Sequence, residues 1–218
     1  MVRTRSKYIS QAGSLARREG RRIATGGSDN FVKRAEAADL PEHVLAAIAP
    51  LFESLKMLNR QIAEADAELE KIVKEDEVVR RLCTAPGVGT VTATTFAATI
   101  DDATRFGAAK QVRSYLGLVP REYSSGERQH RGRISKARGS RARTPLMEAA
   151  WAPPRWRNAK NQDLYDWAMK IAVRRGRARA FVALARKLAG MLYAMWRGGT
   201  EFDPAALRRS VAETAAAA

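Results

Sequence analysis

The stretch APGVGT, residues 85–90, decides how the rest of this sequence is arranged. Proline ends a helix, and two glycines around one valine allow a tight turn because Gly87 can adopt a positive φ angle. Apolar residues flank this turn at helical spacing, in VVRRLC (78–83) before it and in TVTATTFAATI (90–100) after it. The pattern predicts two short helices joined by a hairpin, with Val91, Phe96 and Ile100 on the apolar face of the second.

The bulk composition points to a polyanionic partner. The 218 residues include 39 Lys and Arg against 23 Asp and Glu, a formal charge of +16. This excess indicates a nucleic acid first and an anionic membrane surface second. No apolar run approaches the ~18–20 residues of a membrane span, and no apolar signal segment follows the basic start, so we expect no membrane partner. The cationic loop also lacks the broad apolar face of a membrane-surface protein.

The cysteine and histidine content limits covalent and metal chemistry. The single cysteine, Cys83, excludes an internal disulfide and fits a reducing, cytoplasmic location. It is most simply a small buried residue. With one cysteine and two histidines, His43 and His130, the sequence cannot assemble a zinc site, and we expect no metal ligand in this chain.

The predicted hairpin has the features of a phosphate-binding turn, and it resembles a helix-hairpin-helix. Free N–H groups at the start of the second helix, together with the helix dipole, favour a phosphate oxygen. Such a contact would use the main-chain donors of Gly87, Val88, Gly89 and Thr90, and it would therefore be independent of base sequence. A tight turn between two helices with no ligand is the alternative.

Basic side chains crowd the segment that follows. Two extended pieces, at 118–123 and 132–136, flank a turn at 124–127, and only Glu122 and Glu127 offset the charge locally. Apolar residues at 123, 134 and 146 interrupt the run, which favours an ordered phosphate-binding loop over a disordered basic tail. We expect these side chains to contact a nucleic-acid backbone: Arg121, Arg128, Arg131, Arg133, Lys136, Arg138 and Arg141.

The residues before the hairpin divide into a basic and an acidic part. The first, 1–40, predicts a basic helix ending near Gly20 and a linker; a solvated helix and a nucleic-acid contact are equally open. The second, 41–80, carries apolar residues at alternating spacings of four and three, which is a heptad pattern. We expect a coiled-coil arm that forms a homo-oligomer through 44–79, against the alternative of an amphipathic helix packed on its own domain. Pro50 should kink or restart this helix.

The remaining chain is predicted to be helical. Short helices are expected at 108–117 and 162–169, a helix up to 151 after Pro145, and a basic link at 174–179. The residues 181–196 form a strongly amphipathic helix whose stripe, Leu184, Leu188, Leu192 and Met195, belongs to the core. The fold class is therefore mainly α, with a long helix followed by a helical domain (81–204) that includes a small extended region around 118–136. Residues 205–218 should form a frayed tail.

Several short motifs, taken in order, resemble the C-terminal part of the DEDD-type insertion-sequence transposases. This family includes the RNA-guided bridge recombinases and the pilin-gene invertases. Each motif alone is weak, but the ordered set is specific and extends over nearly all of the chain up to 204. The motifs are TAPGVG (84–89), RF (105–106), YLGLVP (115–120), SG (125–126), GRISK (132–136), AAW (149–151) and ALARKL (183–188).

The resemblance implies a phosphoryl-transfer role for one serine. In such proteins a serine of the C-terminal domain attacks a DNA phosphodiester, and the matching residue is Ser125, with Ser124 as its rival. A following glycine leaves room for a phosphate, and neighbouring guanidinium groups would stabilise charge on its oxygens. The resemblance also implies DNA and a guide (bridge) RNA as partners. No general base is evident, since His130 in a basic loop is more often a phosphate contact or solvated.

The sequence departs from this family in one respect. Family members carry an N-terminal RNase-H-like domain whose acidic residues hold Mg ions, and this sequence starts at the basic helix that normally follows it. Magnesium is therefore expected only for that other domain. We expect this chain alone to bind nucleic acid and self-associate without completing recombination. The competing interpretation is a non-catalytic DNA- or RNA-binding and oligomerisation module.

Overall fold

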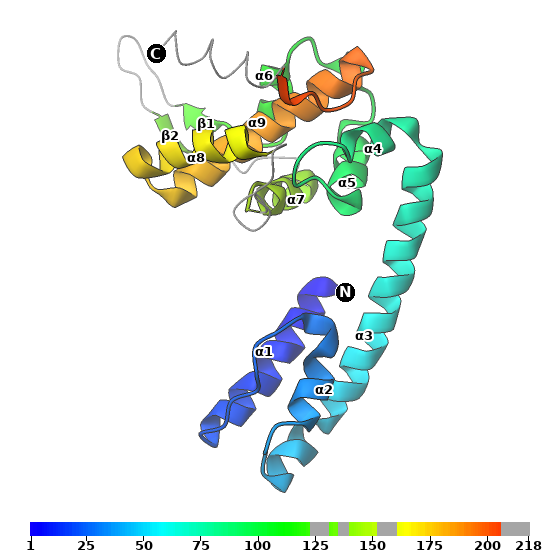
Figure 1. Ribbon diagram of the computed structural model, residues 1–218, viewed down its shortest axis with the longest axis vertical. Helices are drawn as coiled ribbons and strands as arrows, with labels where there is room; N and C mark the ends of the chain where they lie inside the picture. Colours follow the sequence, from blue (N-terminus) through cyan, green and yellow to red (C-terminus); the bar gives the residue numbers. More distant parts are fainter. Residues whose placement is uncertain (123–130, 135–139, 152–160, 206–218) are drawn as a thin grey trace. The chain divides into compact units, whose positions relative to one another are not determined.

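The computed structural model describes residues 1–122, 131–134, 140–151 and 161–205, and these are mainly helical, as predicted (Figure 1). The chain forms two compact units, Met1–Glu68 and Leu69–Ala218. Each unit has a hydrophobic core of its own. The predicted long helix is present as a single element of 34 residues.

The first unit is a small helical assembly. It contains α1 (Val2–Arg18), the short helix η1 (Ser28–Asn30), α2 (Phe31–Glu36) and most of α3 (Glu42–Glu75). Helix α1 ends close to Gly20, as predicted, where φ is +70°. Its small residues Ala12 and Ala16 are fully buried and allow close packing with α2 and α3.

Half of the predicted heptad seam packs inside this unit. Val44, Ile48 and Leu55 of α3 belong to the same core as α1 and α2, together with Phe52, which the heptad pattern did not include. For this part of α3 the alternative interpretation, an amphipathic helix packed on its own domain, is confirmed. Toward the end of the helix Ile72 is 46% exposed. Helix α3 also runs without interruption through Pro50, so the predicted restart there is wrong.

A polar triangle reinforces the first unit. The guanidinium group of Arg5 on α1 pairs with the carboxylate of Asp29 and donates a 3.1 Å hydrogen bond to Oδ1 of Asn59 on α3. The amide of Asn59 donates in turn to the carbonyl oxygen of Asp29 at 3.2 Å. One basic residue of the predicted basic helix is thus used to hold the unit together.

The second unit is organised around one long helix. It contains α4 (Glu77–Leu82), α5 (Thr90–Ile100), η2 (Ala103–Arg105), α6 (Ala109–Tyr115), β1 (Pro120–Glu122), β2 (Arg131–Ile134), α7 (Ser140–Trp151), α8 (Gln162–Arg175) and α9 (Arg177–Gly198). Helix α9 packs against α4, α6, α7 and α8 (Figure 1). The predicted core stripe on α9 is confirmed, since Leu184, Leu188, Leu192 and Met195 are all buried.

Two helix boundaries differ from the sequence predictions. Helix α7 begins at Ser140 and contains Pro145, because its buried face, which includes Ala142 and Leu146, compensates for the one main-chain bond that proline cannot donate. The predicted basic link at 174–179 is also wrong. Helix α8 continues to Arg175 and α9 begins at Arg177, so the link reduces to Gly176, whose φ of +84° favours glycine.

The predicted extended region is a two-stranded antiparallel ribbon. Strands β1 and β2 pair with Pro120 opposite Ile134 and Glu122 opposite Arg131, with a register irregularity between these pairs. The predicted turn at 124–127 lies outside the described residues. Most of the expected frayed tail, 206–218, lies outside them as well.

Candidate functional site

The predicted hairpin is present between α4 and α5. Helix α4 is capped by Asp76, whose carboxylate accepts a 3.0 Å hydrogen bond from the amide of Val79. The chain then turns at Gly87, which is exposed and has a φ of +75°. Ala85 and Val88 are buried in the core beneath the turn. This arrangement explains why glycine occupies position 87, since the left-handed region is costly for other residues.

The start of α5 exposes main-chain donors. Its cap residue is Gly89, which is extended (φ −97°, ψ −178°) and supplies no side-chain cap. The first amides of an α-helix have no partner within the helix, so those of Thr90 and Val91 remain without an intrahelical acceptor. A Cβ placed on Gly89 would meet nothing within 4 Å. An external acceptor can therefore reach this helix end closely.

Two valines near the turn, Val88 before α5 and Val91 within it, have different roles in the structure. The side chain of Val88 is 5% exposed, and its amide donates to the carbonyl oxygen of Ala85 at 3.1 Å. Val91 is 49% exposed, so the prediction that it belongs to the apolar face of α5 is wrong. That face is made by Phe96 and Ile100, as predicted, and by Ala93. Val91 instead lies on the surface next to the helix start.

A hydrogen bond from the far end of the chain anchors the hairpin. The hydroxyl of Thr84 accepts a 3.0 Å hydrogen bond from the amide of Phe202, which follows α9. The same hydroxyl donates to the carbonyl oxygen of Arg81 at 2.8 Å. Phe96 of α5 also lies 6.4 Å from Trp196 of α9, measured between ring centroids. The hairpin is thus fixed to α9 from both of its helices.

The basic residues predicted to contact nucleic acid fall on several elements. Arg121 lies on β1, and Arg131 and Arg133 lie on β2, so the ribbon brings these three positions together. Arg141 is exposed on the first turn of α7, on a helix and not in a loop as predicted. In Figure 1 the ribbon and the α4–α5 turn lie apart from each other, so one nucleic acid contacting both must extend over the helices between them.

Other predicted site residues lie outside the described part of the chain. They are Ser124, Ser125, Arg128, His130, Lys136 and Arg138. The strands β1 and β2 do fix the two ends of the 123–130 segment, because their pairing brings Glu122 opposite Arg131.

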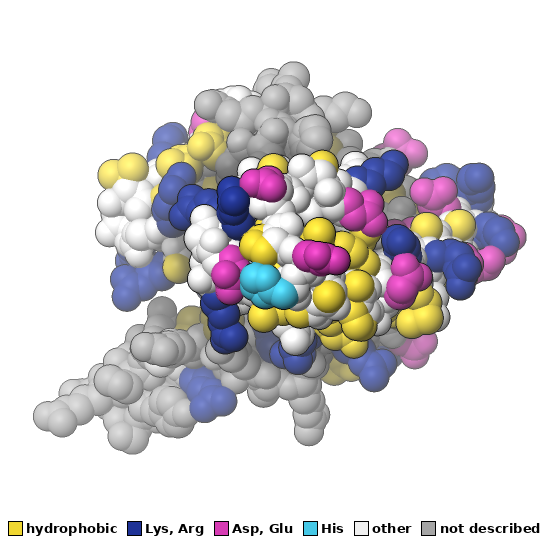
Figure 2. All heavy atoms as spheres, turned by 90° about the horizontal axis from the view of Figure 1, so that it is seen from below, with side chains coloured by type: hydrophobic (Ala, Val, Ile, Leu, Met, Phe, Trp, Pro, Cys, Tyr) yellow, Lys and Arg dark blue, Asp and Glu magenta, His cyan; other side chains and the backbone are white. Residues whose placement is uncertain are grey.

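Three further features bear on the kind of site that the described residues can form: a continuous basic patch, a metal site and a membrane-spanning helix. On the face drawn in Figure 2, Asp and Glu side chains are interspersed with Lys and Arg, so the positive charge does not form one continuous patch there. Among the described residues, no group of three or more His, Cys, Asp or Glu side chains is placed to hold a metal ion. None of the described helices is both long and apolar enough to span a bilayer.

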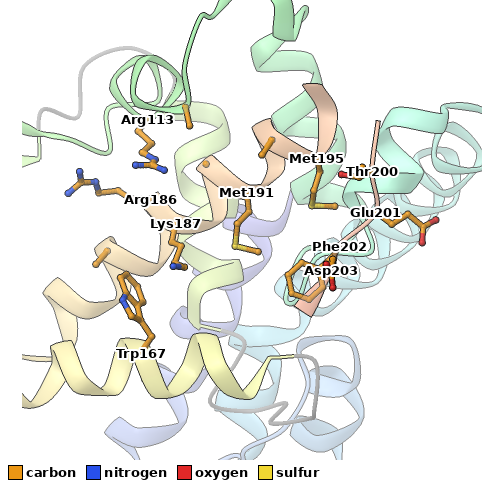
Figure 3. Close-up of a pocket in the computed structure, with 14 residues that line it drawn as sticks. Arg113, Trp167, Arg186, Lys187, Met191, Met195, Thr200, Glu201, Phe202 and Asp203 are labelled. Atoms are coloured by element: carbon orange, nitrogen blue, oxygen red, sulfur yellow. The ribbon is translucent and has the colours of Figure 1, made fainter. Parts of the chain in front are cut away.

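The structure also contains a cationic pocket that the sequence analysis missed. Arg113 of α6 and Arg186 and Lys187 of α9 line one part of a cavity of about 790 Å³, which we call the α6–α9 pocket (Figure 3). Burial lowers the pKa of Lys187 and that of Arg186, and the nearby charge of Arg113 lowers both further. A sequence signal existed in the adjacent basic pair of ALARKL, which interrupts the apolar middle of the helix.

Comparisons with known proteins agree with the motifs of the second unit. Residues 79–166, from α4 into the start of α8, match the family described as "Transposase IS116/IS110/IS902 family". A probable family 20 transposase of Pseudomonas aeruginosa is 32% identical over 196 residues, which cover 90% of this chain and 58% of that protein. Residues 79–166 are thus similar to the transposase domain of that family.

Two further relatives show the same partial coverage. The transposase for insertion sequence element IS1111A of Coxiella burnetii is 30% identical over 200 residues, covering 89% of this chain and 55% of that protein. The transposase for insertion sequence element IS1328 of Yersinia enterocolitica is 29% identical over 168 residues, covering 77% and 50%. The chain thus spans about half the length of these curated relatives.

Proposed function

We propose that this chain is the DNA-binding and strand-transfer half of a transposase. The observation that carries the proposal is the family match over residues 79–166, because that range contains the α4–α5 hairpin, the β1–β2 ribbon and Ser125 together. The net charge of +16 supports a nucleic-acid partner. In this proposal the chain acts on DNA together with a guide RNA, in the cytoplasm and without a membrane partner.

The hairpin would bind the sugar-phosphate backbone. Gly87 and Gly89 are both exposed, and a Cβ at Gly89 would meet nothing within 4 Å. A phosphate oxygen placed there would accept hydrogen bonds from the amides of Gly89 and Thr90 and would lie at the positive end of the helix dipole. Val88 would support the turn from the core, since its side chain is buried. Main-chain donors make this contact independent of base sequence.

Ser125 would act as the nucleophile of strand transfer. Its hydroxyl oxygen would attack a DNA phosphorus atom, forming a serine–phosphate ester while the bond from phosphorus to one deoxyribose oxygen breaks. The serine proton leaves to solvent and the released strand end takes up a proton, so the exchange is balanced. The guanidinium groups of Arg121, Arg131 and Arg133, carried by the ribbon, would stabilise the charge on the phosphoryl oxygens. The chain alone would bind DNA without completing recombination.

The later part of α3 would serve for self-association. Ile72 continues the apolar seam and is 46% exposed, whereas Val44, Ile48 and Leu55 are occupied within the first unit. An exposed apolar residue that continues the seam of a long helix is buried most simply by a second copy of the same helix. The homo-oligomer is therefore proposed to form through the end of the 44–79 segment.

Binding is tested by titrating duplex DNA at several salt concentrations. We expect log Kobs to fall linearly with log salt, with a slope of about −0.9 for each phosphate neutralised. A slope near zero would show that no phosphates are neutralised on binding, and it would contradict the proposal that the chain binds a nucleic acid. Two unrelated duplex sequences should give the same affinity if main-chain donors dominate.

The nucleophile is tested with DNA whose scissile phosphate carries a bridging sulfur. A thiolate leaves without protonation, so the serine ester can accumulate without an acid from another part of the machinery. We expect a covalent adduct that survives denaturing electrophoresis, retained in Ser124→Ala and absent in Ser125→Ala, with equal DNA affinity in all three proteins. An adduct in Ser125→Ala would assign the reaction to another residue.

The second candidate is a non-catalytic nucleic-acid-binding and oligomerisation module. It is favoured because the two features that support binding, the net charge of +16 and the exposed start of α5, need no reactive serine. In that case the sulfur-bridged DNA is bound with normal salt dependence, and no adduct forms in the wild-type chain.

A further inference from the structure

The α6–α9 pocket combines a cationic part with an apolar part. Arg113, Arg186 and Lys187 line one part, and Figure 3 shows Trp167 of α8 close to Lys187. Met191 and Met195 continue the lining along α9 toward Phe202, which follows the helix. A cavity of about 790 Å³ lies within the usual range for a small-molecule site.

The three cations lack acidic partners in the described part of the chain. None of them forms an ion pair with a described residue. The Nε atoms of Arg113 and Arg186 are buried and have no hydrogen-bond partner there. Buried polar groups are nearly always paired, and unpaired like charges repel, so this arrangement is costly unless an anion occupies it.

The fold makes room for this arrangement. Gly190 of α9 is buried, and a Cβ at this position would clash with the guanidinium group of Arg113. The ammonium of Lys187 lies 4.9 Å from the ring centroid of Trp167, which stabilises it without neutralising its charge. Gly190 thus leaves space for Arg113, and the ring of Trp167 positions Lys187. Neither residue supplies a negative charge.

The rest of the lining suits the base of a nucleotide. Aromatic and methionine side chains offer flat, polarisable surfaces against which a base can stack. Glu201 and Asp203 lie beyond Met195, on the side away from Arg113 and Arg186 (Figure 3). Two carboxylates there disfavour a second phosphate, so the pocket suits one nucleotide unit and not a continuous strand.

We propose that the α6–α9 pocket binds a single nucleotide unit, with its phosphate at Arg113, Arg186 and Lys187 and its base between Trp167 and the methionines of α9. None of the lining residues lies on the hairpin or the ribbon, although Phe202 is hydrogen-bonded to Thr84 of the hairpin. The proposal rests on the proposed function only in expecting that the nucleotide belongs to an unpaired strand. A bound phosphate would restore the pKa of Lys187 and Arg186 toward their ordinary values, because it supplies the missing negative charge.

The first test measures binding of a short, labelled single-stranded oligothymidylate and of a blunt duplex of equal length by fluorescence polarisation. Arg186→Gln and Lys187→Gln each remove one pocket charge while keeping a long polar side chain. Arg175→Gln is the matched control, because it removes one exposed charge outside the pocket. We expect each pocket variant to weaken single-strand binding about tenfold, with duplex binding changed no more than in the control.

The second test uses thymidine monophosphate and inorganic phosphate with the same proteins. The indole N–H resonance of Trp167, assigned by Trp167→Phe, should shift and saturate with the mononucleotide, and the shift should be lost in Lys187→Gln. Inorganic phosphate should give a weaker effect because it lacks the base. If the Trp167 shift saturates with thymidine monophosphate but the chain does not bind the oligothymidylate, the ligand of the pocket is a free nucleotide and not a unit of a strand.

These results separate the pocket from the proposed function. Equal losses in the pocket variants and in Arg175→Gln, with no saturable Trp167 shift, would overturn the pocket proposal while leaving the hairpin contact intact. A wild-type chain that binds no oligonucleotide but shows the Trp167 shift would instead contradict the proposed function alone.

Discussion

The hydroxyl of Tyr193 on α9 donates a hydrogen bond to the main-chain carbonyl of Phe106, which lies 87 positions earlier in the sequence. Tyr193 is 7% exposed, so this bond is made in the core. Phe106 also packs on Tyr115 of α6, with 5.4 Å between ring centroids. Through these contacts α9 fixes the chain between α5 and α6.

Replacing Tyr193 with phenylalanine should destabilise the second unit. The substitution leaves the Phe106 carbonyl buried without a donor, which costs about 1–3 kcal/mol. Chemical denaturation followed by tryptophan fluorescence measures the change in the free energy of unfolding. Tyr115→Phe is the control, because the Tyr115 hydroxyl bonds to none of the described residues while its ring makes the contact with Phe106. Equal stability of the two variants would contradict the assigned role of the Tyr193 hydroxyl.

The two exposed glycines of the hairpin should respond differently to alanine. Gly87→Ala places a side chain at a φ of +75° and should cost about 1–2 kcal/mol of stability. Gly89→Ala keeps an extended backbone and meets no neighbour, so it should cost only the difference between glycine and alanine as a helix cap, about 0.5 kcal/mol. Thermal unfolding measures both changes.

The same pair tests the hairpin as a phosphate-binding turn. The methyl group of Gly89→Ala would lie at the start of α5, where a phosphate must approach. We expect this variant to bind duplex DNA more weakly at nearly unchanged stability, with a smaller salt slope. If Gly89→Ala binds DNA as the wild type does, the main-chain contact at α5 is not made.

Cys83 should react slowly in the folded chain. Burial raises the pKa of its thiol, so at pH about 8 the thiolate, which is the reactive form, is depleted relative to an exposed cysteine. We expect modification by a chromogenic disulfide reagent to accelerate strongly when the chain is unfolded in guanidinium chloride. Similar rates in the folded and unfolded chain would show that Cys83 is freely accessible.

Self-association through α3 can be tested with two glutamate substitutions. Ile72→Glu puts a charge on the exposed apolar seam, and Ala67→Glu puts the same charge on α3 away from that seam. Sedimentation velocity over a range of concentrations should show weaker association for Ile72→Glu alone. A wild-type chain that stays monomeric throughout would remove the oligomerisation proposal.

Periodic features of this chain could be predicted from its sequence, and contacts between distant residues could not. The stripe on α9 and the turn at Gly87 follow from local spacing and from the conformational freedom of glycine. The start of α7 was missed because tertiary burial of Ala142 and Leu146 outweighs the local effect of Pro145. Similarly, the heptad pattern of α3 does not reveal whether its partner is another copy or its own unit.

The candidate site likewise has parts that the local sequence predicts and parts that depend on contacts between distant residues. Glycine chemistry and charge were enough to identify the hairpin and the basic ribbon. The cationic pocket depends on Arg113 of α6 meeting Arg186 and Lys187 of α9, which only the packing of the two helices brings about. The space that Gly190 leaves for Arg113 has no signature in the local sequence.

The hydrogen bond between the amide of Phe202 and the hydroxyl of Thr84 also affects how this protein can be shortened or tagged. A chain shortened so that it ends before Phe202 would lose the hydrogen bond to Thr84. The hairpin would then be less firmly held, even though every residue of the turn would still be present. Fusion partners attached beyond Ala205 should leave the hydrogen bond between Phe202 and Thr84 intact. Loss of duplex DNA affinity after such shortening of the chain would report on the hairpin, whereas loss of single-strand binding would also reflect the missing pocket residue Phe202.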